Sequence, residues 1–531
     1  MEEEQPITDY EVGQDNITPF GLDIHNPVFL ISGISIIAFV IVTLMFQQAS
    51  ADFFAWLRPT ITSNFDWFFL SAGNLFVIFA LVVCVSPLGR VRLGGQDATP
   101  DFGYVAWFSM LFAAGMGIGL MFFGVSEPMS HFASSMGGTA MEGSVRTDWA
   151  PLGAAAGDVA AAKDLAMAAT IYHWGLHPWA MYAVVGLGLA FFSFNHKLPL
   201  TLRSVFYPLL GERVWGWWGH IIDTIAVFAT LFGLATSLGF GTQQALAGFN
   251  FLYGWGTGGV AIVLLIGGIT AVAIVSVIRG LDGGVKVLSE MNMGLALLLL
   301  AFIFVAGPTG EIVATMISGA GAYVTEFIPL SMPFGREDTN FSQGWTAFYW
   351  AWWISWSPFV GMFIARVSRG RSVREFIICV IMVPTALCIL WMATFGGTAL
   401  SQVIADASAP VGAAAQEIKL FHMLGDFPLS GLLSLVGIVL VLVFFITSSD
   451  SGSLVIDTIT AGGKTDAPVA QRVFWCVFEG LAAAVLLLVG GAEALGALQA
   501  MAVSTGLPFT VVLLAMCVSL WIGLSRAARE I

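Results

Sequence analysis

Residues 348–376 read FYWAWWISWSPFVGMFIARVSRGRSVREF. Residues 348–365 carry no charged side chain, and arginines then follow at 366, 369, 371 and 374. A membrane-spanning helix needs about 20 mainly apolar residues, and basic residues gather at its cytoplasmic end. The segment 343–366 therefore indicates a helix that crosses a membrane and ends at a cytoplasmic boundary.

The same apolar pattern recurs along the whole chain. Hydrophobic residues make up 57% of the 531 residues and charged residues only 10%, whereas about a quarter of the residues in a soluble protein are charged. Most of the surface must face lipid, so we predict an all-α membrane protein. About twelve segments are long enough to span a bilayer: 28–46, 66–85, 104–125, 166–194, 220–242, 257–278, 287–307, 343–366, 374–397, 429–449, 472–490 and 501–525.

The basic residues predict the orientation. An even number of spans places both termini on the same side of the membrane. Most of the 20 Lys and Arg residues fall in loops on that side. Such residues mark cytoplasmic loops, so we expect a multi-pass protein of the inner (plasma) membrane with both termini in the cytoplasm. Residues 126–165 are predicted to form a long outer loop. The amphipathic stretch 311–330 is predicted to lie along the membrane interface.

Several other classes of protein are excluded. The net charge is −14, and the chain has no basic patch with interleaved aromatic residues, so we expect no nucleic-acid partner. The five cysteines all fall in apolar runs and lack metal-ligand spacing. No nucleophile with its base, phosphate-binding loop or dinucleotide fingerprint is present. The sequence therefore does not indicate an enzyme.

The third span contains three glycines at alternate positions, Gly115, Gly117 and Gly119. Each destabilises a helix by roughly 1 kcal/mol. One interpretation is close helix packing through small residues. The other is a helix unwound at mid-membrane, whose freed carbonyls bind a cation and whose freed N–H groups bind a carboxylate. The glycines alone leave both interpretations open.

Aromatic residues concentrate in two spans. At helical spacing, Trp174, Trp179 and Tyr182 of the fourth span spread over about 140° of one side. In the eighth span, Trp353 and Trp356 are neighbours on one face. Tryptophan in membrane proteins usually lies at the interface, but here several fall within one span. We favour a box of π-faces for a quaternary ammonium or similar cation, with each face contributing about 1–2 kcal/mol.

Hydroxyl groups near the end of the tenth span suggest an ion site. Such hydroxyls usually bond to their own helix, but Thr447 and Ser448 facing unwound carbonyls would form an oxygen-only site for sodium. Spans three, four, five, eight and ten show no Asp, Glu, Lys or Arg near their centres, where a proton relay would need one. Glu479 in the eleventh span is interpreted as structural. For His173 and His177 one interpretation is proton coupling, since histidine titrates near neutral pH; we favour the other, that they orient the fourth span by hydrogen bonding.

Together these strings resemble the betaine/carnitine/choline transporter family. The matching strings are GMGIG at 115–119 with SEP at 126–128, HWGLHPWAMY at 173–182, the opening stretch at 348–376, and FFITSSDSG at 444–452. The similarity covers nearly all spans, and the string at 348–376 is long and specific. The resemblance implies a secondary transporter that works by alternating access, typically as a homotrimer.

The resemblance also implies a LeuT-like fold of two inverted five-helix repeats, preceded by two peripheral helices. The expected layout is an acidic cytoplasmic tail (1–27), the two peripheral helices (28–103), the first repeat (104–307), an interfacial helix with an outer loop (308–342), the second repeat (343–525) and a short cytoplasmic tail (526–531).

The family's binding residues match positions in this sequence. An onium box is implied at Trp174, Trp179, Tyr182 and Trp353, with Trp356 beside it. Met116, Gly117 and Gly119 of the broken third helix and Ser237 of the fifth span complete the expected substrate-binding residues. The coupling ion, Na⁺, is expected at the backbone of Ala113, Met116 and Phe444 and at the hydroxyls of Thr447 and Ser448.

The sequence departs from the family pattern in two places. The family's second sodium site uses two hydroxyls of the fifth span, and Thr230 matches the first, but Leu234 stands where the second belongs. Osmosensing members carry a long basic C-terminal tail, whereas this sequence stops soon after its last span. We therefore expect a weakened second sodium site and no osmotic activation through such a tail.

The expected function is sodium-coupled uptake of glycine betaine or dimethylsulfoniopropionate. Both carry a methylated cationic head, so the aromatic box does not distinguish between them. Two alternatives stay open. The first is a proton-coupled choline importer; choline importers of the family often have Asp at the position of Gly119, so Gly119 counts against this alternative. A sodium-independent carnitine-type exchanger is disfavoured because the fifth span lacks Arg and Lys.

Overall fold

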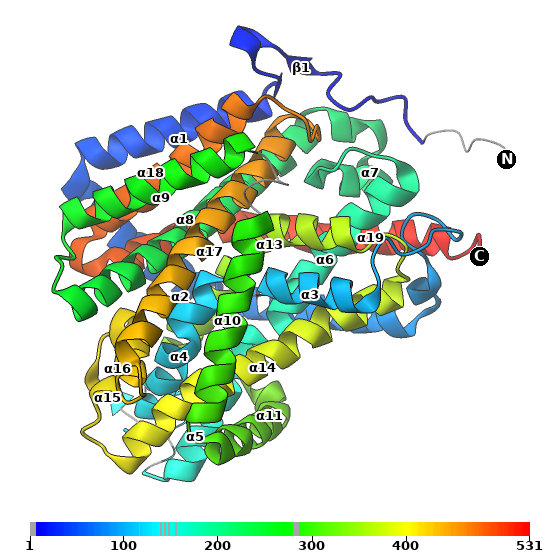
Figure 1. Cartoon of the computed structure of the whole chain (residues 1–531). Coiled ribbons are helices and arrows are strands. Elements are labelled where there is room, and N and C mark those ends of the chain that lie inside the picture. The colour runs from blue at the N-terminus through cyan, green and yellow to red at the C-terminus, as the bar shows by residue number, and fades with distance from the viewer. Residues whose placement is uncertain are drawn as a thin grey trace.

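The computed structural model describes residues 7–115, 117–137, 141–142, 145–146, 149–153, 155, 157–279 and 286–531. Within these residues the chain is almost entirely helical (Figure 1). The strands form two short antiparallel hairpins, β1 (Asn16–Ile17) with β2 (Ile24–His25) and β3 (Met141–Glu142) with β4 (Val145–Arg146). The prediction of an all-α membrane protein is confirmed.

Residues 28–331 fold into eleven of the helices. They are α1 (Val28–Met45), α2 (Gln47–Val85), α3 (Tyr104–Gly115), α4 (Ile118–Met136), α5 (Val159–Trp174), α6 (Leu176–His196), α7 (Tyr207–Leu210), α8 (Trp217–Tyr253), α9 (Gly259–Arg279), α10 (Lys286–Ala306) and α11 (Thr309–Ser331). The second half adds α12 (Thr339–Phe341), α13 (Ala347–Val367), α14 (Val373–Ala405), α15 (Pro410–Ala413), α16 (Lys419–Gly425), α17 (Ser430–Thr460), α18 (Val469–Gly490) and α19 (Ala494–Ala527).

Ten helical runs in the described residues are long and apolar enough to cross a membrane. One of them, Val469–Ala527, contains both α18 and α19, and another, Val159–His196, contains α5 and α6. In the run through α5 and α6, 94% of the most apolar 18-residue stretch is buried inside the protein, whereas only 28% of the corresponding stretch of α9 is buried. Helices α5 and α6 therefore lie at the centre of the bundle, and α9 presents most of its surface to lipid.

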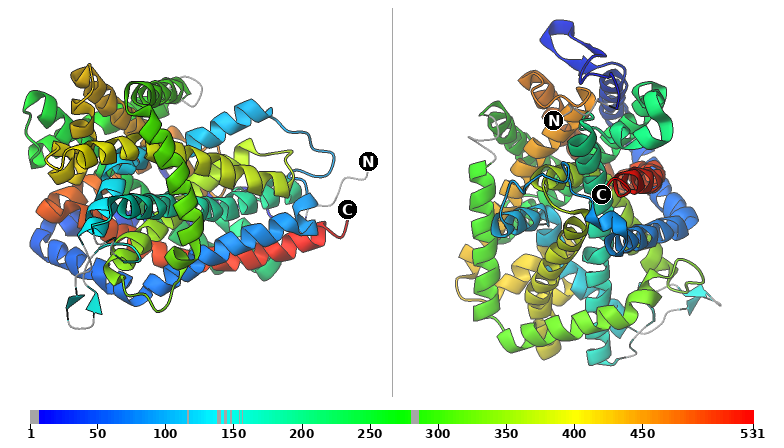
Figure 2. Two further views of the ribbon diagram at one scale, coloured as in Figure 1. Left: turned by 90° about the horizontal axis from the view of Figure 1, so that it is seen from below. Right: turned by 90° about the vertical axis from the view of Figure 1, so that its right-hand side faces the viewer.

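The amphipathic stretch predicted at 311–330 forms α11. This helix packs against α5 and α14, and in the views of Figures 1 and 2 it runs crosswise to α10. Only 22% of the most apolar 18-residue stretch of α11 is buried inside the protein. This helix is also one of the ten runs long and apolar enough to cross a membrane, so its location at the membrane interface stays a prediction.

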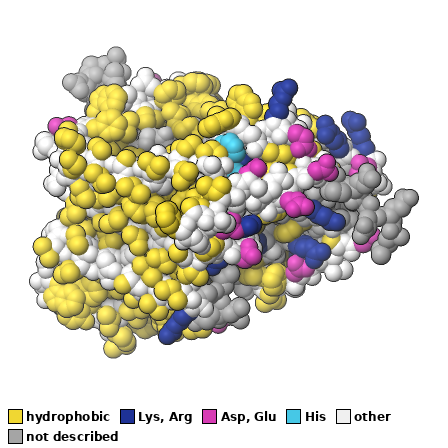
Figure 3. All heavy atoms as spheres, turned by 90° about the horizontal axis from the view of Figure 1, so that it is seen from above, with side chains coloured by type: hydrophobic (Ala, Val, Ile, Leu, Met, Phe, Trp, Pro, Cys, Tyr) yellow, Lys and Arg dark blue, Asp and Glu magenta, His cyan; other side chains and the backbone are white. Residues whose placement is uncertain are grey.

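Charged side chains gather at one end of the molecule. The described N-terminal segment and the end of α19 both lie at this end (Figure 2), and a space-filling view shows mainly hydrophobic side chains away from it (Figure 3). Ion pairs and ring contacts tie the N-terminal segment down: Lys464 Nζ lies 2.6 Å from Asp23, and the Tyr10 ring stacks on Trp215 at 4.0 Å. The described N-terminal segment and the end of α19 therefore lie at the same end of the molecule.

The predicted outer loop at 126–165 is wrong at both ends. Helix α4 continues to Met136, and α5 already begins at Val159. Pro128 lies inside α4, and Ser126 and Glu127 are buried there. The helix persists because α5 and α14 pack along it, so the polar side chains of this segment find partners inside the protein rather than in water.

Close backbone approach between α6 and α13 generates a prediction. A methyl group added at Gly361 would lie 2.6 Å from Val185 Cγ1 and 3.0 Å from the backbone nitrogen of Gly186. Overpacking of this kind costs about 1–3 kcal/mol. We expect Gly361→Ala to lower the midpoint of thermal unfolding in detergent by several degrees.

The matched control is Gly267→Ala on α9, where an added methyl group meets nothing within 4 Å. Alanine favours a helix by roughly 1 kcal/mol over glycine, so this variant should unfold at the same or a slightly higher temperature. Equal midpoints for the two variants would contradict the close α6–α13 packing.

Candidate functional site

Two helical runs at the centre of the bundle are interrupted. Between α3 and α4, Gly117 adopts an extended conformation (φ −169°, ψ −175°). Between α5 and α6, Gly175 adopts φ −97° and ψ −126°, and a Cβ there would lie 2.6 Å from the carbonyl oxygen of Ile171. The unwound third span is thus confirmed. The break at Gly175 is a feature that the sequence analysis missed.

The two breaks border one cavity, whose volume is about 40 Å³. All the predicted substrate-binding residues line it except Met116, which lies outside the described residues. The lining residues are Ala114, Gly117, Gly119, Leu120, Trp174, Pro178, Trp179, Tyr182, Ser237, Trp352, Trp353 and Trp356. The sequence did not predict Trp352 as part of this set.

Four aromatic rings stand at steep angles to one another around this cavity. Trp174 meets Trp353 with ring centroids 4.8 Å apart and planes at 79°, and Tyr182 meets Trp353 at 6.1 Å and 84°. Trp179 meets Tyr182 at 5.3 Å and 78°. All four rings are almost fully buried. Perpendicular π-faces in a dry cavity suit a methylated cation, which cannot donate N–H hydrogen bonds.

Hydrogen bonds outside the cavity hold the neighbouring indole rings. Trp353 Nε1 donates to the carbonyl oxygen of His173 at 2.9 Å, and Trp356 Nε1 donates to that of Gly233 at 2.9 Å. Trp352 Nε1 donates to Ser237 Oγ at 3.1 Å. The polar edge of each ring is therefore satisfied, which leaves the faces available for a ligand. Ser237 acts here as a support for Trp352.

A second cavity brings the predicted sodium residues together. Ala113 of α3 and Phe444, Thr447 and Ser448 of α17 all line it. Its other lining residues are Ala114, Ser289, Asn292, Met293, Trp356, Phe359, Val360, Phe363 and Ser451. Because Ala114 and Trp356 line both cavities, an ion in one would adjoin a ligand in the other.

The hydroxyls in this second cavity are of the ligand type that hard cations take. In the structure, the Thr447 hydroxyl donates within α17, to the carbonyl oxygens of Val443 at 2.9 Å and Phe444 at 3.3 Å. The sequence analysis missed Asn292 of α10, which is buried and whose side-chain amide has no hydrogen-bond partner in the described part of the chain. An uncharged amide in an otherwise apolar span was the available signal.

The predicted remnant of a second sodium site does not gather further ligands. The Thr230 hydroxyl donates to the carbonyl oxygen of Ala226 in its own helix at 2.7 Å. Leu234 is buried, and a Cβ added at Gly452 would lie 2.3 Å from its side chain. Neither Thr230 nor Leu234 lines either cavity, so Leu234 serves to pack α8 against α17.

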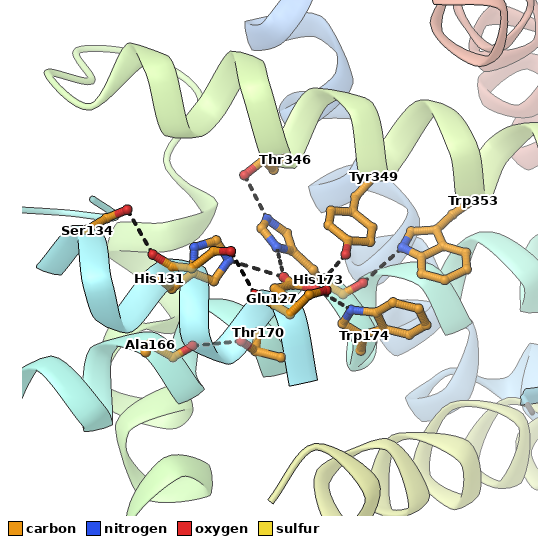
Figure 4. A network of polar contacts seen from close by, with 12 residues as sticks. Glu127, His131, Ser134, Ala166, Thr170, His173, Trp174, Thr346, Tyr349 and Trp353 are labelled. Atoms are coloured by element: carbon orange, nitrogen blue, oxygen red, sulfur yellow. Dashed lines mark hydrogen bonds and ion pairs between the residues drawn. The ribbon is translucent and has the colours of Figure 1, made fainter. Parts of the chain in front are cut away.

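A buried carboxylate lies behind the aromatic rings (Figure 4). Glu127 of α4 has 0% exposed surface and contacts His173 and Trp174 of α5. The sequence analysis placed this residue in an outer loop and so missed it. The available signal was an acidic residue two positions after the apolar run Phe122–Val125, close enough for the helix to continue through it.

Comparison with known proteins agrees with this geometry. A family model described as "BCCT, betaine/carnitine/choline family transporter" matches residues 27–529. The chain is 64% identical to a glycine betaine/proline/choline transporter of Vibrio parahaemolyticus, over 98% of this chain and 95% of that one. It is 54% identical to glycine betaine transporter 1 of the same organism (97% of both chains) and 41% identical to a glycine betaine transporter of Acinetobacter baylyi (95% and 73%).

The packing around Gly119 generates a prediction. A Cβ at this position would lie 2.8 Å from the Trp174 ring and 3.0 Å from the Trp352 ring. We expect Gly119→Ala to displace Trp174 and to weaken binding of a trimethylammonium ligand by roughly tenfold, the loss of about one cation–π contact. Titration of tryptophan fluorescence measures the change.

Gly321→Ala on α11 is the control, because an added methyl group there meets nothing within 4 Å. It should bind the ligand like the wild type. Unchanged affinity in a folded Gly119→Ala variant would mean that the Trp174 ring does not contact the ligand.

Proposed function

The chain belongs to the betaine/carnitine/choline family of transporters, and we propose that it imports a betaine-type zwitterion, glycine betaine or dimethylsulfoniopropionate, together with sodium by alternating access. The observation that carries this proposal is the cavity in which Trp174, Trp179, Tyr182 and Trp353 converge. This cavity adjoins the second cavity, formed by α3, α10, α13 and α17, which contains the hydroxyls of Thr447 and Ser448.

The two ends of such a zwitterion meet different chemistry in the cavity. The perpendicular rings face a methylated ammonium or sulfonium head, whose charge is spread over its methyl groups. The carboxylate has a counterpart at the N-terminus of α4, where Gly117 and Ile118 begin the helix. The first N–H groups of a helix lack partners within it, and its dipole favours a negative charge there. A half-helix beginning at mid-membrane is a known device for binding such a group.

Sodium would be held by oxygen atoms of α3 and α17. The carbonyl groups of Ala113 and Phe444 and the hydroxyls of Thr447 and Ser448 are the proposed ligands, and Met116 lies outside the described residues. The bound ion would supply positive charge next to the broken helix. Its effect on substrate binding would pass through Ala114 and Trp356, which border both cavities.

We also propose the family architecture for this chain. Residues 104–307 and 343–525 would form the two inverted repeats, and three copies would assemble as a homotrimer. The Lys and Arg side chains at the end that holds the described N-terminal segment and the end of α19 support a cytoplasmic location for that end (Figure 3).

Choline is the second candidate substrate. The relative that is 64% identical is named a glycine betaine/proline/choline transporter, and the aromatic box accepts the head of choline as well as that of betaine. Choline lacks a carboxylate, however, and Gly119 supplies no acidic replacement. A panel of glycine betaine, dimethylsulfoniopropionate, choline, carnitine and proline in proteoliposomes separates these substrates.

Uptake of betaine into proteoliposomes should require an inward sodium gradient. We expect a low stoichiometry, one sodium ion per substrate, because Thr230 and Leu234 form no second site. Thr447→Ala with Ser448→Ala should raise the sodium concentration for half-maximal uptake at least about tenfold, since two ligand oxygens are lost. Thr458→Ala, whose hydroxyl bonds within α17 away from the cavity, should leave that concentration unchanged.

Uptake that continues undiminished when potassium replaces sodium would overturn the sodium coupling. A pH gradient that drives uptake without sodium would favour a proton-coupled importer instead. A measured ratio of two sodium ions per substrate would show that other oxygens replace the missing hydroxyl at Leu234.

Replacing Trp353 with Leu should weaken betaine binding about tenfold, through the loss of roughly 1–2 kcal/mol of cation–π attraction. Fluorescence titration measures binding, and circular dichroism reports folding. Trp67→Leu, at a partly exposed position outside both cavities, is the control. If folded Trp353→Leu binds betaine as tightly as the control, Trp353 does not face the cation.

A further inference from the structure

We propose that Glu127 is the positioning residue of the aromatic box. Its carboxylate fixes the rings of Trp174 and Trp353 and places a negative charge behind them, so that the site selects a cationic head over a neutral head of the same shape. The inference rests on the proposed function, because it explains how that cavity recognises an onium group.

Hydrogen bonds saturate the Glu127 carboxylate. One oxygen, Oε1, accepts from His173 Nδ1 at 2.6 Å and from His131 Nε2 at 3.2 Å. The other, Oε2, accepts from Trp174 Nε1 at 2.7 Å and from the Tyr349 hydroxyl. A carboxylate offers about four acceptor sites when it is ionised, whereas a protonated carboxyl must donate one hydrogen bond. Since every neighbour in this network is a donor, the arrangement fits the ionised form.

His173 is placed to donate to Glu127 as a neutral ring. Thr346 Oγ1 lies 3.0 Å from His173 Nε2. With Nδ1–H donated to Glu127, Nε2 is left to accept the threonine proton, which makes the ring a neutral imidazole. Thr346 ends a short π-helical segment, Ser342–Thr346, that precedes α13. This segment therefore sets the position of the His173 ring.

A bound metal ion is a weaker explanation of the same cluster. The ligand-type atoms of Glu127, His131 and His173 lie within 4.8 Å of one another. The 2.6 Å contact between His173 Nδ1 and the carboxylate is, however, the length of a charge-assisted hydrogen bond. Oε2 is also already engaged by two further donors. The contacts are thus those of a hydrogen-bonded network.

The network reaches both tryptophan walls of the box (Figure 4). Trp174 is bonded to Glu127 directly. Trp353 is bonded through His173, whose side chain contacts Glu127 and whose carbonyl oxygen accepts from Trp353 Nε1 at 2.9 Å. The Tyr349 ring stacks on His173 at 4.6 Å and on Trp353 at 5.9 Å. Displacing the carboxylate would therefore move both walls.

The charge adds a second effect. An indole that donates its N–H to a carboxylate is polarised by it, which makes the face of the ring more negative. Glu127 itself lies behind the ring and outside the residues that line the cavity. It attracts a cation through the low-dielectric interior without offering the hydrogen-bond acceptor that ammonium ions would prefer. A methylated onium group is thereby favoured over both neutral groups and small ammonium ions.

The test compares pairs of ligands that differ only in charge. Glycine betaine is paired with 3,3-dimethylbutanoate, and choline with 3,3-dimethylbutan-1-ol, in which carbon replaces the cationic nitrogen. Affinities come from displacement of bound betaine in the detergent-purified full chain. We expect the wild type to prefer the ligand with the cationic head in each pair by at least tenfold, and Glu127→Gln to reduce that preference at least tenfold. We expect the affinity of Glu127→Gln for 3,3-dimethylbutan-1-ol, which carries no charge, to change less than threefold.

Glu127→Asp keeps the charge but cannot reach Trp174 and His173 together. It should weaken betaine binding about tenfold while it retains the preference for the cation. Glu479→Gln is the matched control, because Glu479 is equally buried but contacts Ser449 and Ser453 of α17 rather than the rings. This control should keep the cation preference of the wild type.

The possible outcomes separate the two proposals. If the wild type shows no preference for the ligand with the cationic head in either pair, both the onium site and the proposed role of Glu127 are overturned. A wild-type preference that Glu127→Gln retains overturns only the charge role. If Glu127→Gln does not fold, Glu127→Asp decides, since unchanged betaine affinity in that variant overturns the positioning role.

Discussion

The structure depends on one constraint of the bilayer: backbone N–H and C=O groups in hydrocarbon need partners inside the protein. A helix can therefore be broken at mid-membrane only where the break is enclosed. Here the breaks at Gly117 and Gly175 lie in the centre of the bundle, where α5 and α6 are almost completely buried. The groups freed by the breaks are then available to a charged ligand and an ion. The position of the site follows from this requirement.

Selectivity in such a site comes from what lies behind the cavity wall as much as from the wall itself. The aromatic faces point inward, while the indole nitrogens of Trp352, Trp353 and Trp356 are bonded outward to Ser237, His173 and Gly233. This division turns the indole nitrogens away from the ligand and leaves the ring faces to meet it. It also makes the box depend on helices α5, α8 and α13 keeping their relative positions, which links ligand binding to the arrangement of the bundle.

Much of the site could be predicted because each residue type has a narrow use in a membrane. Alternating glycines in the third span, hydroxyls beside an apolar run, and tryptophans in the middle of a span all conflict with a simple lipid-facing helix. Ala113, Phe444, Thr447 and Ser448 line one cavity as expected, and the four box aromatics line the other. The positions of Glu127 and Asn292 in the structure could not be predicted in this way. A single polar residue near the end of a span is equally compatible with a loop and with the buried core.

The sequence by itself determined the all-helical membrane class, the family, most residues of the aromatic cavity and four residues of the second cavity. These properties follow from local composition and from strings that are contiguous in the chain. Only the tertiary structure decided that α4 continues past Pro128, that Glu127 faces His173 and Trp174, and that Leu234 packs against Gly452. Those contacts join residues far apart in the chain, and whether a polar side chain is buried depends on which helices cover it rather than on its neighbours in sequence.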